Sequence, residues 1–147
     1  YITGGKTGFT EIARRTLVTT ATKDNLNLVI VTLNDGNDFK NHLDLYESTF
    51  KKYKSYKILK KYKINIVGEK YYDNLYIKND FYYPLNEYEV DNIVLKFKLD
   101  KDSSSDIVGK VIVYFNDSSI YEDNVYQEIE KKKENIFIKI YNWLFKW

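Results

Sequence analysis

The residues Gly4-Gly-Lys-Thr-Gly-Phe-Thr10 form the stretch that decides the fold. They are β-tolerant and interrupted by glycines, which predicts a strand that another backbone can approach closely. Residues 16–21 and 26–33 are β-branched or apolar, and Thr22-Lys-Asp-Asn25 between them has turn chemistry, so they predict a β-hairpin. Because residues 26–33 are apolar on both faces over much of their length, we expect a central strand covered by helices on each side.

A helix is predicted next, from about Asp38 to Lys52. The turn Asn34-Asp-Gly-Asn37 precedes it, and Asn37 or Asp38 can cap it because a short side-chain oxygen there accepts early backbone N–H groups. The apolar side chains of the helix recur along one stripe, at Phe39, Leu43, Tyr46, Phe50 and Tyr53. Strand, hairpin and helix together indicate the closing part of a mixed sheet.

A separate small β-domain is predicted after the helix. Its β-rich pieces are separated by turn-forming residues at fairly regular spacing and lie at 63–67, 74–77, 91–99 and 108–115. The lysine- and tyrosine-rich segment 50–62 before them indicates a solvated linker. The predicted division of the chain is 1–54, 55–128 and a terminal segment, 129–147.

The terminal segment predicts an amphipathic helix. Its polar positions form one narrow stripe and leave a broad apolar and aromatic face: Asn135, Lys139, Asn142 and Lys146. A helix over 135–147 is about 20 Å long, short of the roughly 30 Å needed to cross the hydrocarbon core. We therefore expect it to lie in the membrane interface, and packing of its apolar face on the β-domain is the alternative.

Composition excludes several classes of chemistry. Lys and Arg total 23 against 21 Asp and Glu, a net charge of +2, which is far from the basic excess of a nucleic-acid domain. The interleaved lysines and tyrosines of 50–62 could stack bases, but the near-neutral charge favours the linker. Without cysteine there is no disulfide, thiolate nucleophile or cysteine-based zinc site.

The single histidine, His42, argues against a multi-histidine metal site and against a Ser-His-Asp triad. It falls inside the helical pattern, where we expect a helix-surface residue. No metal and no cofactor is expected.

The first stretch resembles the third motif of low-molecular-mass penicillin-binding proteins, the serine-type D-alanyl-D-alanine carboxypeptidases. The resemblance continues through Ala13-Arg-Arg-Thr-Leu-Val-Thr19 and the Lys23-Asp-Asn turn. It extends over the order of the later elements, including Val108-Gly-Lys-Val-Ile-Val-Tyr114 and the amphipathic tail, and so spans essentially the whole chain. It implies an α+β fold: the end of a β-lactamase-like mixed sheet with its helix, a small all-β domain, and a C-terminal amphipathic helix.

The resemblance assigns roles to four consecutive residues. The ammonium of Lys6 is the catalytic group, near the nucleophilic serine, and the Thr7 hydroxyl binds the substrate carboxylate. Gly8 lets a peptide substrate pair with the strand as an added β-strand. The backbone N–H of Phe9 corresponds to one oxyanion-hole donor.

Departures from the family pattern are also expected to matter. Arg14 stands where the family usually has glycine, which suggests a backbone bend that arginine enters only with strain. The Ser-x-x-Lys and Ser-x-Asn motifs of the family belong upstream of Lys-Thr-Gly. Ser48-Thr-Phe-Lys51 matches the first of them but follows Lys-Thr-Gly and lies at the end of the predicted helix, so we interpret it as coincidence.

Two functions follow from this reading. The chain is expected to be the C-terminal part of an enzyme that trims the terminal D-alanine from peptidoglycan stem peptides and is acylated by β-lactam antibiotics, which places it in cell-wall synthesis and the control of cell shape. Its expected location is the extracytoplasmic face of the bacterial membrane, held there by the tail. The alternative is a non-catalytic, membrane-associated β-module or a decayed homologue.

Deletion of 135–147 should release the protein from anionic liposomes and leave the melting transition of the β-domain nearly unchanged, because an interfacial helix contributes to binding rather than to the core. Liposome co-sedimentation and thermal melts measure the two effects. A large fall in melting temperature with unchanged liposome binding would instead establish that the helix packs on the β-domain.

Overall fold

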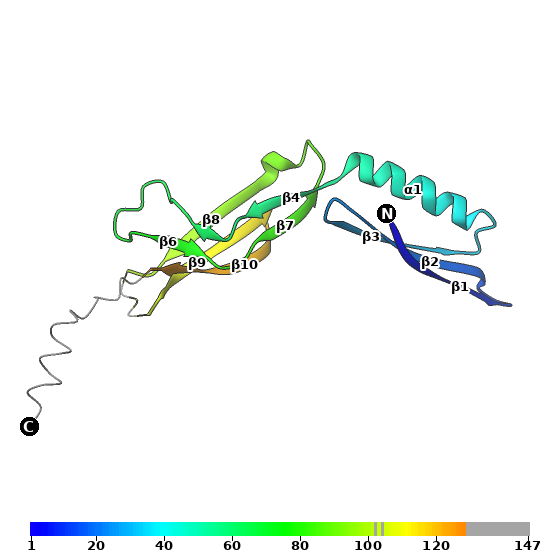
Figure 1. Cartoon of the computed structure of the whole chain (residues 1–147), viewed down its shortest axis with the longest axis horizontal. Coiled ribbons are helices and arrows are strands. Elements are labelled where there is room, and N and C mark those ends of the chain that lie inside the picture. The colour runs from blue at the N-terminus through cyan, green and yellow to red at the C-terminus, as the bar shows by residue number, and fades with distance from the viewer. Residues whose placement is uncertain (102, 104, 129–147) are drawn as a thin grey trace, which may run out of the picture.

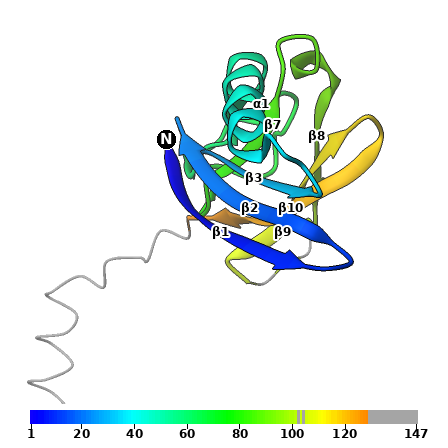
Figure 2. The ribbon, with the colours of Figure 1, turned by 90° about the vertical axis from the view of Figure 1, so that its right-hand side faces the viewer.

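The computed structural model describes residues 1–101, 103 and 105–128, and the predicted terminal helix lies outside them. The N-terminal part is a three-stranded antiparallel sheet in the order β1-β2-β3 with one helix, α1, on one face (Figures 1 and 2). The bounds are β1 (Ile2–Thr10), β2 (Arg14–Lys23), β3 (Leu26–Leu33) and α1 (Asp38–Lys52). The predicted strand, hairpin and helix are confirmed.

The β2–β3 hairpin turns through two residues, Asp24 and Asn25. Both have positive φ, 48° and 63°, as a two-residue turn that matches the twist of its strands requires. Aspartate and asparagine adopt this conformation more readily than other residues with side chains. The turn thereby fixes the pairing of Lys23 with Leu26 and the register of the whole hairpin.

The expectation of a central β3 covered on both faces is wrong. β2 is the central strand, and β3 is an edge strand whose outer face leaves Val29, Val31 and Leu33 61 to 66% exposed. The reason is that the described residues supply one helix for this sheet, and α1 covers only the face that carries Thr19 and its neighbours. The second apolar face of β3 therefore stays open.

The helix is also rotated relative to the predicted stripe. Its buried residues are Asp38, His42 and Tyr46, whereas Phe39 and Leu43 are 55% and 43% exposed. Tyr46 of the predicted stripe is fully buried as expected, so the rotation is smaller than the roughly 100° that one residue along a helix represents. Asn37 is the N-cap but makes no side-chain capping bond; Asp38 Oδ1 instead accepts the N–H of Phe39.

Polar contacts account for this rotation. His42 Nδ1 lies 2.7 Å from Thr19 Oγ1, and His42 Nε2 lies 3.0 Å from Thr32 Oγ1. The same Thr19 hydroxyl lies 2.8 Å from the hydroxyl of Tyr46. His42 is therefore not a helix-surface residue: both its ring nitrogens are paired with strand hydroxyls.

An ion pair fixes the first turn of α1 to β2. The Arg15 guanidinium lies 2.5 Å from Asp38, whose side chain is almost fully buried. The hydrogen bond from Arg15 holds the pKa of the Asp38 carboxyl below its ordinary value. A buried carboxylate needs such a partner, because unpaired it would be costly.

Residues 54–127 form a second set of strands. A five-stranded sheet has the order β5-β6-β10-β9-β8, and β4 pairs with β7. The bounds are β4 (Lys54–Leu59), β5 (Tyr62–Lys63), β6 (Leu75–Ile77), β7 (Phe81–Leu85), β8 (Ile93–Leu99), β9 (Ile107–Phe115) and β10 (Ser118–Gln127), with a short 3-10 helix at Val90–Asn92. The core between these layers contains Leu59, Leu75, Ile77, Val108, Val111, Val113 and Val125. The predicted small β-domain is thus found, although the piece at 63–67 is shorter than expected.

The segment predicted as a solvated linker is largely a strand. Leu59 of β4 is 4% exposed and belongs to the core. The lysines of β4 are neutralised locally, because Lys54 lies 3.4 Å from Glu87 and Lys57 lies 3.0 Å from Asp80. These contacts argue against an accessible basic patch here. Among the described residues, no helix is long and apolar enough to cross a membrane.

Gly109 marks a bulge where β8 and β9 come very close. Its φ is +156°, and the register with β10 shifts between Val125 and Tyr126 beside it. A Cβ at this position would collide with the backbone carbonyl oxygen of Lys98 and come within 2.8 Å of Leu99 Cα. Backbone atoms cannot step aside cheaply, so this site accepts only glycine.

Gly109→Ala should lower the free energy of unfolding by about 2 to 4 kcal/mol, because the added methyl group forces two paired strands apart. Urea denaturation of the chain measures the loss. The matched control is Gly36→Ala, where a Cβ meets nothing within 4 Å and stability should change little. Equal stability of the two variants would contradict the close approach.

Candidate functional site

The four residues with predicted roles lie on β1, the edge strand of the N-terminal sheet. Every residue of β1 is exposed, and in the described part of the chain β2 is its only strand partner. Lys6, Thr7, Gly8 and Phe9 pair in order with Val18, Leu17, Thr16 and Arg15. The strand therefore offers one wall of a site rather than an enclosed pocket.

Lys6 lies on the face of the sheet that α1 does not cover. The register aligns Lys6 with Val18 and Val31 in one row across the strands. The next row contains Thr7, Leu17 and Thr32, and Thr32 contacts His42 of α1. Because side chains alternate between faces, Lys6 is on the open face and Thr7 on the α1 face.

The backbone groups of Thr7 and Phe9 point away from the sheet. The N–H of Asn34 donates to Arg15 O at 2.7 Å, so the backbone of Arg15 faces β3. Bonding direction alternates along an antiparallel strand, so Thr16 and Val18 face β1 and bond Gly8 and Lys6. The intervening residues of β1 then direct their N–H and C=O groups outward along the free edge.

The Lys6 side chain contacts the backbone of its own strand. The Lys6 ammonium donates to the carbonyl oxygen of Thr7 at 2.6 Å. It is exposed and forms no ion pair within the described residues. The Lys6 ammonium on the open face and the outward backbone donors are thus available to an anionic peptide lying along β1, and the Thr7 hydroxyl lies on the α1 side of the same strand.

The close approach of another backbone that the glycines predict is present. A Cβ on Gly5 would come within 2.9 Å of Val18 O, and a Cβ on Gly8 within 2.6 Å of Thr16 Oγ1. Close packing against the β2 backbone therefore requires glycine at Gly5, whereas a Cβ at Gly8 would require the Thr16 side chain to shift. The predicted role of Gly8 toward a peptide is compatible with this packing but is not its cause.

The bend expected at Arg14 is present. Arg14 has φ +58°, in the left-handed region that glycine adopts without cost. It ends the β1–β2 turn, in which the N–H of Ala13 donates to Thr10 Oγ1 at 2.9 Å. The arginine therefore occupies a strained backbone next to the predicted oxyanion donor, Phe9.

Ser48 is remote from Lys6. It lies on α1, on the opposite side of the sheet from the face that carries Lys6, and its hydroxyl donates to Leu45 O at 3.0 Å. A match to a motif does not overcome this separation. The described residues also contain no group of three or more His, Asp or Glu side chains that could hold a metal ion.

Comparison with known proteins shows the fold. No family model and no curated protein sequence matches the chain. It is similar to the crystal structure of penicillin binding protein 5 from Haemophilus influenzae, with a TM-score of 0.55 and 22% identity over 83% of this chain and 40% of that one. It is also similar to the D-alanyl-D-alanine carboxypeptidase DacD from Francisella tularensis, with a TM-score of 0.53 and 17% identity over 84% of this chain and 34% of that one. The chain thus has the fold of part of these proteins and spans less than half the length of each.

Arg14→Gly should raise the free energy of unfolding by about 0.5 to 1 kcal/mol. Relief of the left-handed strain contributes about 1 to 2 kcal/mol, and the greater freedom of glycine in the unfolded chain offsets part of it. Urea denaturation measures the gain. Arg14→Ala keeps the strain and should show no gain; equal stabilisation by both substitutions would point to the side chain instead.

Proposed function

We propose that this chain is part of a serine-type D-Ala-D-Ala carboxypeptidase and forms one wall of its active site. The observation that carries the proposal is the free edge of β1, where Lys6 is followed by outward backbone groups at Thr7 and Phe9. The similarity in fold to penicillin binding protein 5 and DacD supports it.

In this proposal a stem peptide ending in D-Ala-D-Ala binds along β1 as an added strand. Its terminal carboxylate accepts charge-assisted hydrogen bonds from the Lys6 ammonium and from the Thr7 hydroxyl at this edge. The Phe9 N–H stabilises the oxyanion that develops on the scissile carbonyl. Positioning and charge stabilisation are therefore the contributions of these residues.

In this proposal the nucleophilic serine is supplied by polypeptide outside these 147 residues. Its oxygen attacks the amide carbonyl and the terminal D-alanine leaves; water then releases the acyl group from the serine. Lys6 keeps the proton network near this serine poised. β-lactam antibiotics acylate the same serine, and the reaction needs no cofactor.

The remaining parts of the chain have proposed supporting roles. The unit at 55–128 positions the catalytic unit, and 129–147 holds it at the membrane. This arrangement places the enzyme on the extracytoplasmic face of the bacterial membrane, where its peptidoglycan substrate is. The division at 54/55 and this location stay predictions.

A non-catalytic module is the second candidate function. The strained Arg14 beside the site favours it, because an enzyme that no longer turns over tolerates distortion near its oxyanion donor. Such a protein would keep the β-unit and its attachment to the membrane but would not hydrolyse the peptide.

Substitutions in a protein that joins this chain to the part carrying the nucleophilic serine distinguish the two candidate functions. Thr7→Val should lower kcat/KM for a peptide ending in D-Ala-D-Ala by a factor corresponding to roughly 1 to 3 kcal/mol, because one donor to the carboxylate is removed. Lys6→Ala should lower it further, since a charge near both carboxylate and nucleophile is lost. Steady-state assays of D-alanine release measure both.

The control is the isolated chain with a fluorescent penicillin. It should show no covalent label, because the acylated serine is absent from it, and Ser48→Ala should be indistinguishable from the unaltered chain. Full activity of both Lys6 and Thr7 variants would overturn the site assignment, and labelling at Ser48 would overturn the assignment of the nucleophile.

A further inference from the structure

The five-stranded sheet has an outer face, opposite the face that packs in the core of this unit. Its inner face carries Val111, Val113 and Val125, which are in the core. The residues that alternate with these point the other way. The register places Lys98 beside Lys110, and Lys96 beside Ile112, on this outer face.

The charges on this face are mostly positive. Its lysines are Lys63, Lys78, Lys96, Lys98 and Lys110, and its one acidic residue among the strand positions is Glu122. Glu128 lines a hollow with Lys63 and Tyr76 at one end of the face, so the surplus is three positive charges on one face, whereas the whole chain carries +2. The near-neutral composition therefore conceals a local basic surface.

Most of this charge is not neutralised by ion pairs among the residues that the structure describes. Lys110 and Glu122 form an ion pair at 2.6 Å. Among the described residues no ion pair involves Lys63, Lys78, Lys96 or Lys98, and all four are exposed. Their charges are available to an anionic partner.

Tyrosines accompany the lysines on the same face. Tyr76 and Tyr126 stack with ring centroids 5.4 Å apart, and the Lys78 ammonium lies 3.5 Å from the centroid of the Tyr126 ring. Toward the β8 edge of the same face, Lys96 lies 4.6 Å from the centroid of the Tyr114 ring. Tyrosine and lysine together are typical of surfaces at the headgroup level of a membrane.

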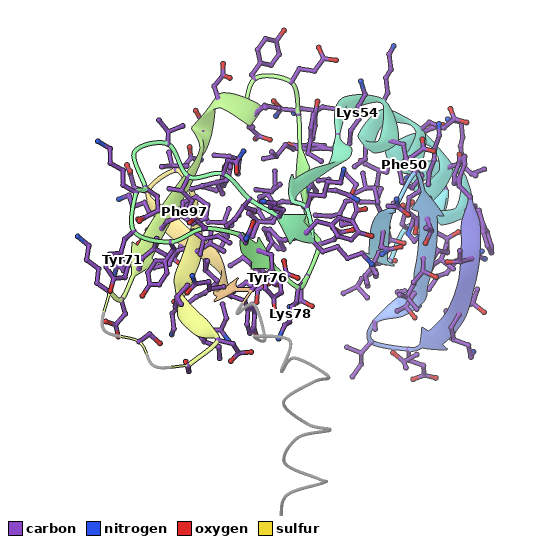
Figure 3. All side chains as sticks on the ribbon, turned by 60° about the vertical axis from the view of Figure 1, so that its left-hand side comes forward. Phe50, Lys54, Tyr71, Tyr76, Lys78 and Phe97 are labelled. Atoms are coloured by element: carbon purple, nitrogen blue, oxygen red, sulfur yellow. The ribbon has the colours of Figure 1, made fainter. Side chains whose placement is uncertain are left out.

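The aromatic end of the face adjoins the end of β10. Tyr76 and Glu128 line the same hollow, of about 260 Å³, and the N–H of Glu128 donates to Asn74 O at 3.2 Å. Figure 3 shows the Tyr76 and Lys78 side chains near each other at this end of the sheet. The residues after 128 are those whose sequence predicts an interfacial helix, so the face and the helix lie next to each other along the chain.

We propose that this face, defined by the five lysines with Tyr76, Tyr114 and Tyr126, docks on the surface of an anionic phospholipid bilayer. The face presents its charges over two dimensions, which suits a bilayer better than a single polymer strand. Each lysine near such a surface contributes attraction to anionic lipids. The docking is a second membrane contact, independent of the Lys6 site and additional to the proposed tail.

The test uses the full chain and vesicles of phosphatidylcholine with or without phosphatidylglycerol. A lysine at an anionic surface is worth about 1 kcal/mol, a factor of roughly five in partitioning. Lys96→Gln with Lys98→Gln should therefore lower the partition coefficient onto phosphatidylglycerol vesicles by at least about tenfold, and the two Lys→Glu changes should lower it more. Lys63→Gln with Lys78→Gln repeats the test at the other edge if the first pair impairs folding in a thermal melt.

The matched control is Lys23→Gln with Lys51→Gln, which removes the same charge from the N-terminal part and should leave partitioning nearly unchanged. Equal losses in control and test pairs would overturn the proposal, because net charge alone would then explain binding. Unchanged binding of the test pairs would overturn it too, and if deletion of 135–147 then abolished binding, the tail would be the whole membrane contact. Equally strong binding to soluble polyphosphate, per phosphate, would replace the bilayer with a general polyanion.

Discussion

The hydroxyl of Thr19, shared between His42 and Tyr46, determines the rest of the N-terminal arrangement. A buried hydroxyl must keep its hydrogen bonds, so α1 can lie on the sheet only with this face inward. The Arg15–Asp38 ion pair fixes the same orientation at the first turn of α1. Because α1 occupies the Thr19 face, the face of Lys6 stays open.

Sequence reasoning found the elements of this part but not their burial. The strand bearing Lys6 and the bend at Arg14 follow from local signals: glycine spacing and a position that calls for positive φ. The orientation of α1 does not, because hydrophobic periodicity assigns the buried stripe to apolar side chains and here Asp38 and His42 are buried in polar contacts. The sequence did contain one signal for the buried face: Asp38 and His42 are four residues apart and therefore lie on the same side of the helix.

In the β-unit, too, elements with a clear pattern in their own sequence were predicted, and elements that depend on contacts with distant segments were not. Strands with alternating aliphatic residues, β8 and β9, were predicted close to their bounds. β4 and β7 were missed, because their lysines, tyrosines and one proline resemble loop composition and become strand only by pairing with each other. Ring contacts such as Phe81 of β7 on Tyr121 of β10, with centroids 4.0 Å apart, pack the β4–β7 pair on the five-stranded sheet and cannot be found by a pattern within one segment.

The free edge of β1 has a further consequence for the molecule in concentrated solution. Unpaired backbone groups that accept an extended peptide also accept β1 of another copy, and exposed edges are where sheet proteins associate. In such a pair Lys6 would lie opposite or close to Lys6 of the other copy, and like charges at that distance are unfavourable. The glycines of β1 also weaken the strand. The residue assigned to the chemistry thus also discourages self-association of the edge on which it lies.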